Sequence, residues 1–276
     1  MKRIIMLFAA VMSVFSCLKA QTPQDSTAIR FPESFSHPGI NTVDGAESLD
    51  AFFKKAMETG KPRVMMIGDS HVFGKILPNT VSARMKEIWP EMEFTSLSKN
   101  GVQLVYFLNA VRYNRIKDFH PDLLIVSVGT NESHNSAFNA EKYQRQMQEL
   151  ASIVDSLSPG TTLLFTTTPG SHNRTYGKHR VSRGGRTRWH SYMISKTPNT
   201  RNKTVSDCQA DFCRQHGYAI WNLYEIAGGK EYACKNWVAT NLMRGDAVHF
   251  SAEGYRLQAN MLVDALEKLY NDCKKK

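Results

Sequence analysis

Short apolar segments alternate along the chain with longer segments of helical periodicity, and this alternation restricts the fold more than any other feature. Strand-length segments lie at residues 63–68, 93–101, 122–129, 161–170 and 218–224. Helix-like segments lie at residues 47–60, 79–89, 102–113, 143–157, 205–217 and 251–270. Strands that alternate with helices form parallel sheets joined by right-handed crossovers. The sequence therefore predicts an α/β fold with a central parallel sheet of about five strands covered on both faces by helices.

The N-terminal residues have the pattern of an export signal. Lys2 and Arg3 precede the apolar run "IIMLFAAVMSVF", which is short for a membrane span. We expect a signal peptide over residues 1–20, cleaved after Ala20, with lipid attachment at Cys17 as the alternative. Residues 21–44 are polar and contain proline, as in a leader, and residues 45–273 form the predicted domain. The expected location is periplasmic or extracellular.

Composition narrows the range of partners. The formal net charge of +10 favours an acidic partner such as an anionic glycan, and the chain has no nucleic-acid-binding motif. No later segment is long and apolar enough to cross a bilayer. Four cysteines follow the signal, and their spacings match no zinc motif. The sequence leaves open whether they pair and which oligomer forms; these residues are Cys208, Cys213, Cys234 and Cys273.

Polar clusters follow the predicted strands at the points where the strands end. "GDSH" (68–71), "KNG" (99–101) and "GTNESH" (129–134) follow the first three strands, and "GDAVHF" (245–250) precedes the last helix. The carboxyl ends of parallel strands meet at one edge of a sheet, where open α/β folds bind their ligands. We therefore expect these clusters to form one site.

The clusters contain the groups that acyl transfer to a serine requires. Ser70 is the candidate nucleophile, His249 the base that takes its proton, and Asp246 the acceptor that orients the imidazole. Backbone N–H groups of Ser70 and Gly101 and the side-chain amide of Asn131 are candidate donors to an oxyanion.

Ser70, Gly101, Asn131 and His249, in this order, resemble the four signature positions of the SGNH/GDSL hydrolase family. The resemblance implies a flavodoxin-like three-layer α/β/α sandwich and hydrolysis of an ester by a Ser-His-Asp mechanism without a cofactor or metal. His71 departs from the leucine that usually follows Gly-Asp-Ser. The stretch "HFSAEGYRLQANML" is similar to exported bacterial members that remove acetyl groups from peptidoglycan or other carbohydrate, which implies an acetylated glycan as the substrate.

Three other functions remain open on the sequence alone. An O-acetyltransferase would use the same serine and pass the acetyl group to a sugar. A glycan-binding module would keep the fold but has no need of a base behind a serine. A metal-dependent phosphoesterase would use Asp69, His71, Glu132 and His134 as ligands, although no Asp-x-His loop precedes "GDSH" and no His-x-His lies near the end of the sequence.

Residues 171–200 form a long, basic insertion after the fourth strand. A strand-to-helix connection usually has about two to six residues, so we interpret the segment either as a solvated loop or as a basic lip over the active site. Four residues in it are candidates for binding an acidic substrate, namely Arg183, Arg186, Arg188 and Trp189.

Overall fold

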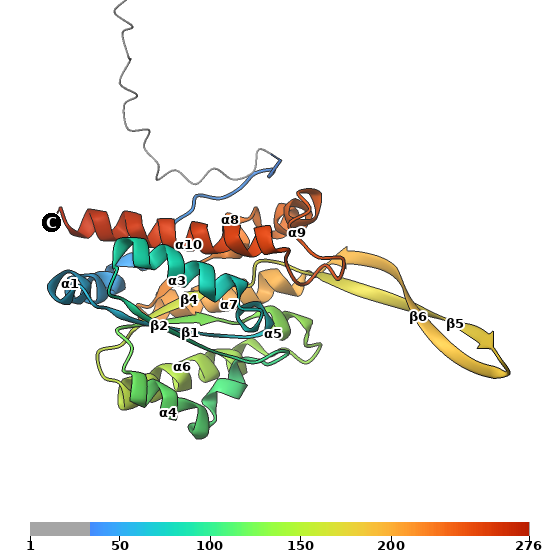
Figure 1. Cartoon of the computed structure of the whole chain (residues 1–276), viewed down its shortest axis with the longest axis horizontal. Helices are drawn as coiled ribbons and strands as arrows, with labels where there is room; N and C mark the ends of the chain where they lie inside the picture. The colour runs from blue at the N-terminus through green and yellow to red at the C-terminus, as the bar shows by residue number, and fades with distance from the viewer. Residues whose placement is uncertain (1–33, 276) are drawn as a thin grey trace, which may run out of the picture.

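The computed structural model describes residues 34–275, with residues 110–114 described by their backbone alone. The predicted signal peptide (1–20) and Cys17 lie outside the described residues. Within this range a five-stranded parallel sheet forms the centre of the molecule (Figure 1). Its strands, in spatial order, are β2 (Glu93–Ser98), β1 (Arg63–Gly68), β3 (Leu123–Ser127), β4 (Thr162–Thr166) and β7 (Ala219–Trp221). This is the flavodoxin-like strand order, and it confirms the predicted fold class.

Helices cover both faces of the sheet and complete a three-layer sandwich. One face carries η1 (Ala46–Leu49), α1 (Asp50–Thr59), α2 (Ser70–Phe73), α3 (Ile76–Ile88), α8 (Leu223–Ile226), α9 (Gly229–Ala239) and α10 (Ala252–Cys273). The other face carries η2 (Leu104–Leu108), α4 (Ala110–Phe119), α6 (Ala140–Leu157) and α7 (Arg201–His216). The short helix α5 (Thr130–His134) follows β3 at the edge of the sheet.

Side chains of one strand serve both cores, because successive residues of a strand point to opposite faces. On β1, Val64 and Met66 belong to the core under α1, α3 and α10, whereas Met65 and Ile67 belong to the core over α4, α6 and α7. Each of these four side chains is buried. This two-sided burial is the physical reason for the continuous apolar runs that the sequence shows.

The helices differ from the prediction in detail. Residues 102–113 do not form one helix, because Asn109 is extended (φ −73°, ψ 121°) and separates η2 from α4. Helix α9 was not expected; Trp237 anchors it in the core, with its indole N–H donating to Pro169 O at 2.7 Å.

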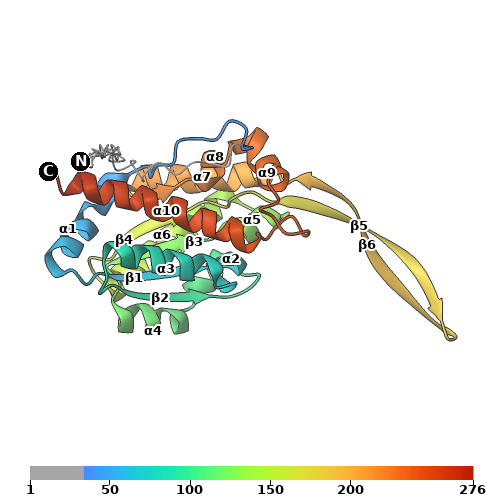
Figure 2. The same ribbon diagram turned by 45° about the horizontal axis from the view of Figure 1, so that its top comes forward.

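Residues 171–200 form a β-ribbon, not a loop. Strands β5 (His172–Arg183) and β6 (Arg186–Pro198) pair in antiparallel fashion, and Gly184 and Gly185, both with positive φ, make the turn. The ribbon projects away from the domain (Figure 1, Figure 2), and we call it the arm. The expectation of a lip folded over the site is therefore wrong, because the two halves of the segment pair with each other and carry the tip outward.

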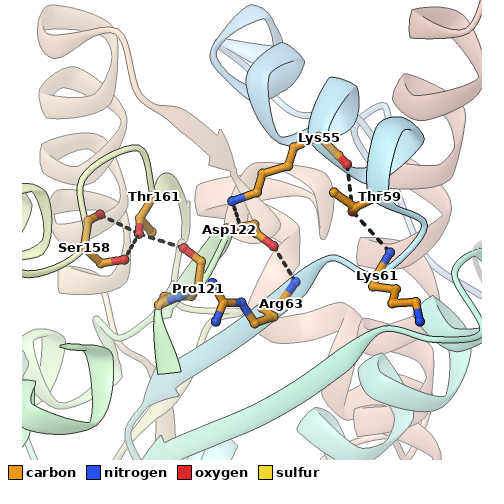
Figure 3. A network of polar contacts seen from close by, with 8 residues as sticks. All are labelled: Lys55, Thr59, Lys61, Arg63, Pro121, Asp122, Ser158 and Thr161. Carbon is orange, nitrogen blue, oxygen red and sulfur yellow. Dashed lines mark hydrogen bonds and ion pairs between the residues drawn. The ribbon is translucent and has the colours of Figure 1, made fainter. Parts of the chain in front are cut away.

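The edge of the sheet at the amino ends of the strands is closed by a polar network (Figure 3). The buried Asp122 carboxylate accepts a hydrogen bond from Arg63 N at 2.7 Å and pairs with the Lys55 ammonium. Thr161 Oγ1 donates to the carbonyl groups of Pro121 and Ser158. These contacts fix the starts of β1 and β3 and the turn before β4, and they leave the opposite edge for the site.

Part of the segment expected as a leader lies on the domain. Phe35 and Val43 are buried in the core, and Phe35 packs edge-on against Trp237 with ring centroids 5.0 Å apart. The four cysteines of the described chain are all free and buried. No helix between residues 34 and 275 combines the length and the apolar character needed to span a bilayer.

Candidate active site

Ser70 lies at the carboxyl end of β1, on a turn that requires glycine. A Cβ atom on Gly68 would lie 2.5 Å from Ser127 O and 2.4 Å from a methyl group of Val72, so no other residue fits there. The chain then turns into helix α2, whose first residue is Ser70. The Asp69 carboxylate caps this helix by accepting a hydrogen bond from His71 N at 3.0 Å. The sharp turn leaves Ser70 partly exposed.

His249 and Asp246 complete a hydrogen-bonded chain with Ser70. His249 Nε2 lies 2.9 Å from Ser70 Oγ, and His249 Nδ1 lies 2.8 Å from Asp246 Oδ2. An ionised carboxylate only accepts hydrogen bonds, so Nδ1 carries the proton and Nε2 is free to accept the proton of Ser70. This is the arrangement of nucleophile, base and orienting acid that activates a serine.

The loop that carries Asp246 and His249 is fixed by its own hydrogen bonds. Asp246 Oδ1 accepts from Val248 N at 3.0 Å and from His249 N at 2.9 Å. Partial burial opposes ionisation of Asp246, but these backbone donors and the hydrogen-bonded His249 side chain together outweigh it, so the pKa of Asp246 is lower than its usual value. The residue is therefore an anion at neutral pH, as is needed to stabilise a charged imidazolium.

The three expected oxyanion donors lie on neighbouring elements. Among the described residues, neither Ser70 N nor Gly101 N has an intramolecular acceptor, so both can donate to a substrate. Gly101 has a φ of +71°, a conformation that favours glycine. The Asn131 amide, in contrast, already donates to Asp69 Oδ2 at 3.2 Å and to Val102 O at 2.8 Å. A substrate oxygen must share or replace one of these bonds.

Glu132 holds together the two loops that carry Gly101 and Asn131, a role that the sequence did not indicate. Its buried carboxylate accepts from Leu104 N at 2.6 Å and from Gly129 N at 3.0 Å. It thus ties the segment after Gly101 to the start of α5. Burial raises the pKa of Glu132 to about 7 despite these donors. The only sequence signal was an acidic residue within the polar cluster that follows an apolar strand.

His71 is a buried neighbour of the triad. Its Nδ1 lies 3.0 Å from Tyr255 OH, its Nε2 lies 3.1 Å from Thr130 Oγ1, and its ring centroid lies 5.6 Å from that of His249. Burial, helped by the positive charge that His249 acquires, lowers the pKa of His71 to about 3. The ring is therefore neutral at physiological pH and positions α2 against α5 and α10.

This buried histidine should make the protein less stable in acid. The pKa of His71 is about 3 in the folded chain against an ordinary value of 6.5, so the unfolded chain takes up the proton first as the pH falls. The contribution of neutral His71 to the free energy of unfolding is fully present above pH 6.5 and is lost as the pH falls towards 3. A His71→Gln variant keeps donor and acceptor atoms but does not titrate. Between pH 7 and pH 5 the wild type should lose about 2 kcal/mol relative to this variant, measured by urea unfolding. Equal pH dependence of the two proteins would contradict the assignment of a neutral, buried His71.

The residues of the metal-site alternative do not converge. His71 faces Tyr255 and Thr130, whereas His134 Nε2 lies 3.0 Å from Ser171 Oγ. Asp69 and Glu132 are held by backbone N–H groups. Within residues 34–275, no three histidine, cysteine, aspartate or glutamate side chains are placed to hold a metal ion.

The predicted substrate-binding residues lie far out on the arm. Arg183 and Arg186 flank its turn, and Arg188 and Trp189 follow on β6, all of them exposed. The structure therefore does not bring them beside Ser70. Their contact with substrate stays a prediction.

Comparison with known proteins identifies the fold. No protein-family model matches the chain, and no curated protein matches it in sequence. Among solved structures, it is similar to a peptidoglycan O-acetylesterase (17% identity, 86% of this chain and 100% of the other covered, TM-score 0.69). It is also similar to the acetyl xylan esterase AlAXEase (17% identity, 74% and 99% covered, TM-score 0.53). A third similar structure is a GDSL-like lipase from Bacteroides thetaiotaomicron (15% identity, 79% and 98% covered, TM-score 0.50). The chain thus has the fold of the SGNH/GDSL-type esterases.

Proposed function

We propose that this chain is an exported serine esterase of the SGNH/GDSL type that removes O-acetyl groups from a cell-envelope or dietary polysaccharide. The observation that supports this proposal most is the chain of hydrogen bonds from Ser70 Oγ through His249 to Asp246, at 2.9 and 2.8 Å. The likeness in fold to a peptidoglycan O-acetylesterase and an acetyl xylan esterase supports an acetylated carbohydrate as the substrate. The apolar, basic N-terminus supports export.

The reaction begins with attack of Ser70 on the ester. Ser70 Oγ bonds to the carbonyl carbon while its proton passes to His249 Nε2, and Asp246 stabilises the imidazolium that forms. The carbonyl oxygen becomes an anion that accepts hydrogen bonds from Ser70 N, Gly101 N and the Asn131 amide. When the tetrahedral intermediate collapses, the bond to the sugar oxygen breaks and His249 returns the proton to that oxygen.

The second half of the reaction releases acetate. His249 takes a proton from water, and the hydroxide attacks the carbonyl carbon of the acetyl-serine. When the second tetrahedral intermediate collapses, the bond to Ser70 Oγ breaks, His249 returns the proton to that oxygen, and acetic acid leaves and ionises to acetate. These steps use no cofactor. An O-acetyltransferase would differ only here, because a sugar hydroxyl would take the place of water.

Acetate release tests the substrate class. Acetylated peptidoglycan, acetylated xylan, acetylated pectin and O-acetylated sialic acid are incubated with the mature protein, and free acetate is measured. At least one should release acetate with the wild type and not with Ser70→Ala. Transfer of acetyl groups to an added glycan, with little free acetate, would favour the transferase. No acetate and no transfer with every substrate would contradict the proposed substrate class.

A further inference from the structure

The arm concentrates positive charge on one thin projection. Residues 171–200 contain seven arginines and lysines and no acidic residue, against a formal net charge of +10 for the whole chain. β5 has 12 residues, so the arm is roughly 40 Å long at about 3.3 Å per residue. Such a density of one sign favours an anionic partner that extends along the arm.

One face of the arm combines cations with aromatic rings. Arg180 pairs with Trp189 across the ribbon, and Tyr176 pairs with Met193. Paired residues share a face, and so do residues two apart on a strand, which places Lys178 between Tyr176 and Arg180. The Arg174 guanidinium extends this face, lying 5.8 Å from the centre of the Tyr176 ring. We call this surface the cationic face.

The rings of the cationic face are not used for packing within the domain. Trp189 is 68% exposed and Tyr176 is 52% exposed. An isolated two-stranded ribbon gains little stability in water, and exposed tryptophan adds none. Both faces of the arm are open along nearly its whole length. The arm therefore has the structure of a contact surface without a partner in the free protein.

The root of the arm is bonded to the loops of the active site. His172 N, at the start of β5, donates to Ala247 O at 2.9 Å, between Asp246 and His249. Asn199, just after β6, donates through its side-chain amide to Ser133 O at 3.0 Å in α5. The root of the arm therefore lies beside the loop that carries His249 and beside α5 (Figure 2).

We propose that the cationic face binds an acidic glycan chain and leads it toward Ser70. This inference rests on the proposed function for its substrate, an acetylated polysaccharide. Arginine and lysine pair with the carboxylates of the polymer, and Trp189 and Tyr176 lie flat against its sugar rings. The partner is therefore a polymer of acidic sugars that extends well beyond the single ester group on which the triad acts.

The composition of the arm argues against two other partners. A second copy of the arm would bring cations against cations, and charges on exposed strands oppose such pairing. Insertion into a lipid bilayer requires an apolar tip, whereas the tip here is Arg183-Gly184-Gly185-Arg186. Nucleic acid shares the required negative charge, so it enters the experiment as a competing ligand.

Binding is tested in the Ser70→Ala background, so that the result does not depend on hydrolysis. Fluorescently labelled polygalacturonate is titrated with the mature protein and its anisotropy is followed at low ionic strength. Lys178→Gln with Arg180→Gln should weaken binding about tenfold. The matched control, Lys54→Gln with Lys86→Gln, removes the same charge from exposed positions on α1 and α3 and should bind as before. As a separate variant, Trp189→Ala should weaken binding severalfold at about 0.15 M salt, where the attraction between charges is screened.

Each outcome decides the inference. Equal loss of affinity in the arm variant and the control would mean that only net charge matters, and would overturn the proposal. Unchanged affinity in Trp189→Ala at the higher salt would overturn the stacking of sugar on the cationic face. Tighter binding of a double-stranded DNA fragment than of polygalacturonate would overturn the glycan assignment. If the wild type hydrolyses no ester but this binding is observed, the proposed function is refuted, whereas the assignment of the cationic face to glycan binding is retained.

Discussion

Ser70→Ala should lower turnover of a nitrophenyl acetate ester by roughly 10⁴-fold or more, because the only nucleophile of the proposed reaction is removed. His249→Ala should be almost as impaired, since without its imidazole the Ser70 proton has no acceptor. The double variant should be no worse than either single variant, because the groups act as a unit. Nitrophenol release under saturating substrate measures all three.

A matched serine variant separates chemistry from stability. Ser136 is exposed and lies just beyond α5, so Ser136→Ala should retain wild-type turnover. The Ser70→Ala protein should unfold at the same urea concentration as the wild type to within a small margin, because Ser70 is only partly buried. Wild-type turnover by Ser70→Ala would end the serine mechanism.

Asn131→Ala should lower kcat by roughly 10²–10³-fold with little change in KM, the effect of losing one oxyanion donor. The amide is bonded to Asp69 and Val102 in the free protein, so its bond to substrate strengthens only as the carbonyl oxygen becomes an anion. Asn131→Asp keeps the shape of the side chain but removes both donors, and it should be impaired at least as much.

The steady-state parameters of both Asn131 variants distinguish the possible roles. A rise in KM with unchanged kcat would show that Asn131 binds the ground state of the substrate. Full activity in Asn131→Asp would show that the side chain only supports the loop around Val102. Either result would contradict its place among the oxyanion donors.

The sequence was sufficient to predict strands β1, β3 and β4 because these strands are buried on both faces. The apolar runs at 63–68, 122–129 and 161–170 contain β1, β3 and β4, and the polar clusters after them meet at one edge. Ser70 and His249 are 179 residues apart and yet within hydrogen-bonding distance. The alternation of elements predicted a parallel sheet with the polar clusters at one edge, whereas the flavodoxin-like order of the strands was implied only by the resemblance to the SGNH/GDSL family.

The arm and the buried contacts of His71 could not be predicted from the sequence, for different reasons. Strands exposed on both faces have no apolar alternation, so β5 and β6, rich in arginine, serine and threonine, have the composition of a loop. His71 contacts Tyr255, 184 residues away, and no local pattern indicates such a pair. The free donors of Ser70 and Gly101 were predictable, whereas the bond from Asn131 to Asp69 depends on side-chain positions that only the fold determines.

Covalent labelling tests the central claim, that Ser70 is an activated nucleophile, most directly. An alkyl fluorophosphonate forms a bond between phosphorus and a nucleophilic serine oxygen, with loss of fluoride. Peptide mass spectrometry of the labelled wild type should place one adduct on Ser70, and labelling should be absent from Ser70→Ala and strongly slowed in His249→Ala. The account would be contradicted if Ser70 stayed unlabelled in protein that hydrolyses esters. It would also be contradicted if an adduct formed in Ser70→Ala at the same rate as in the wild type.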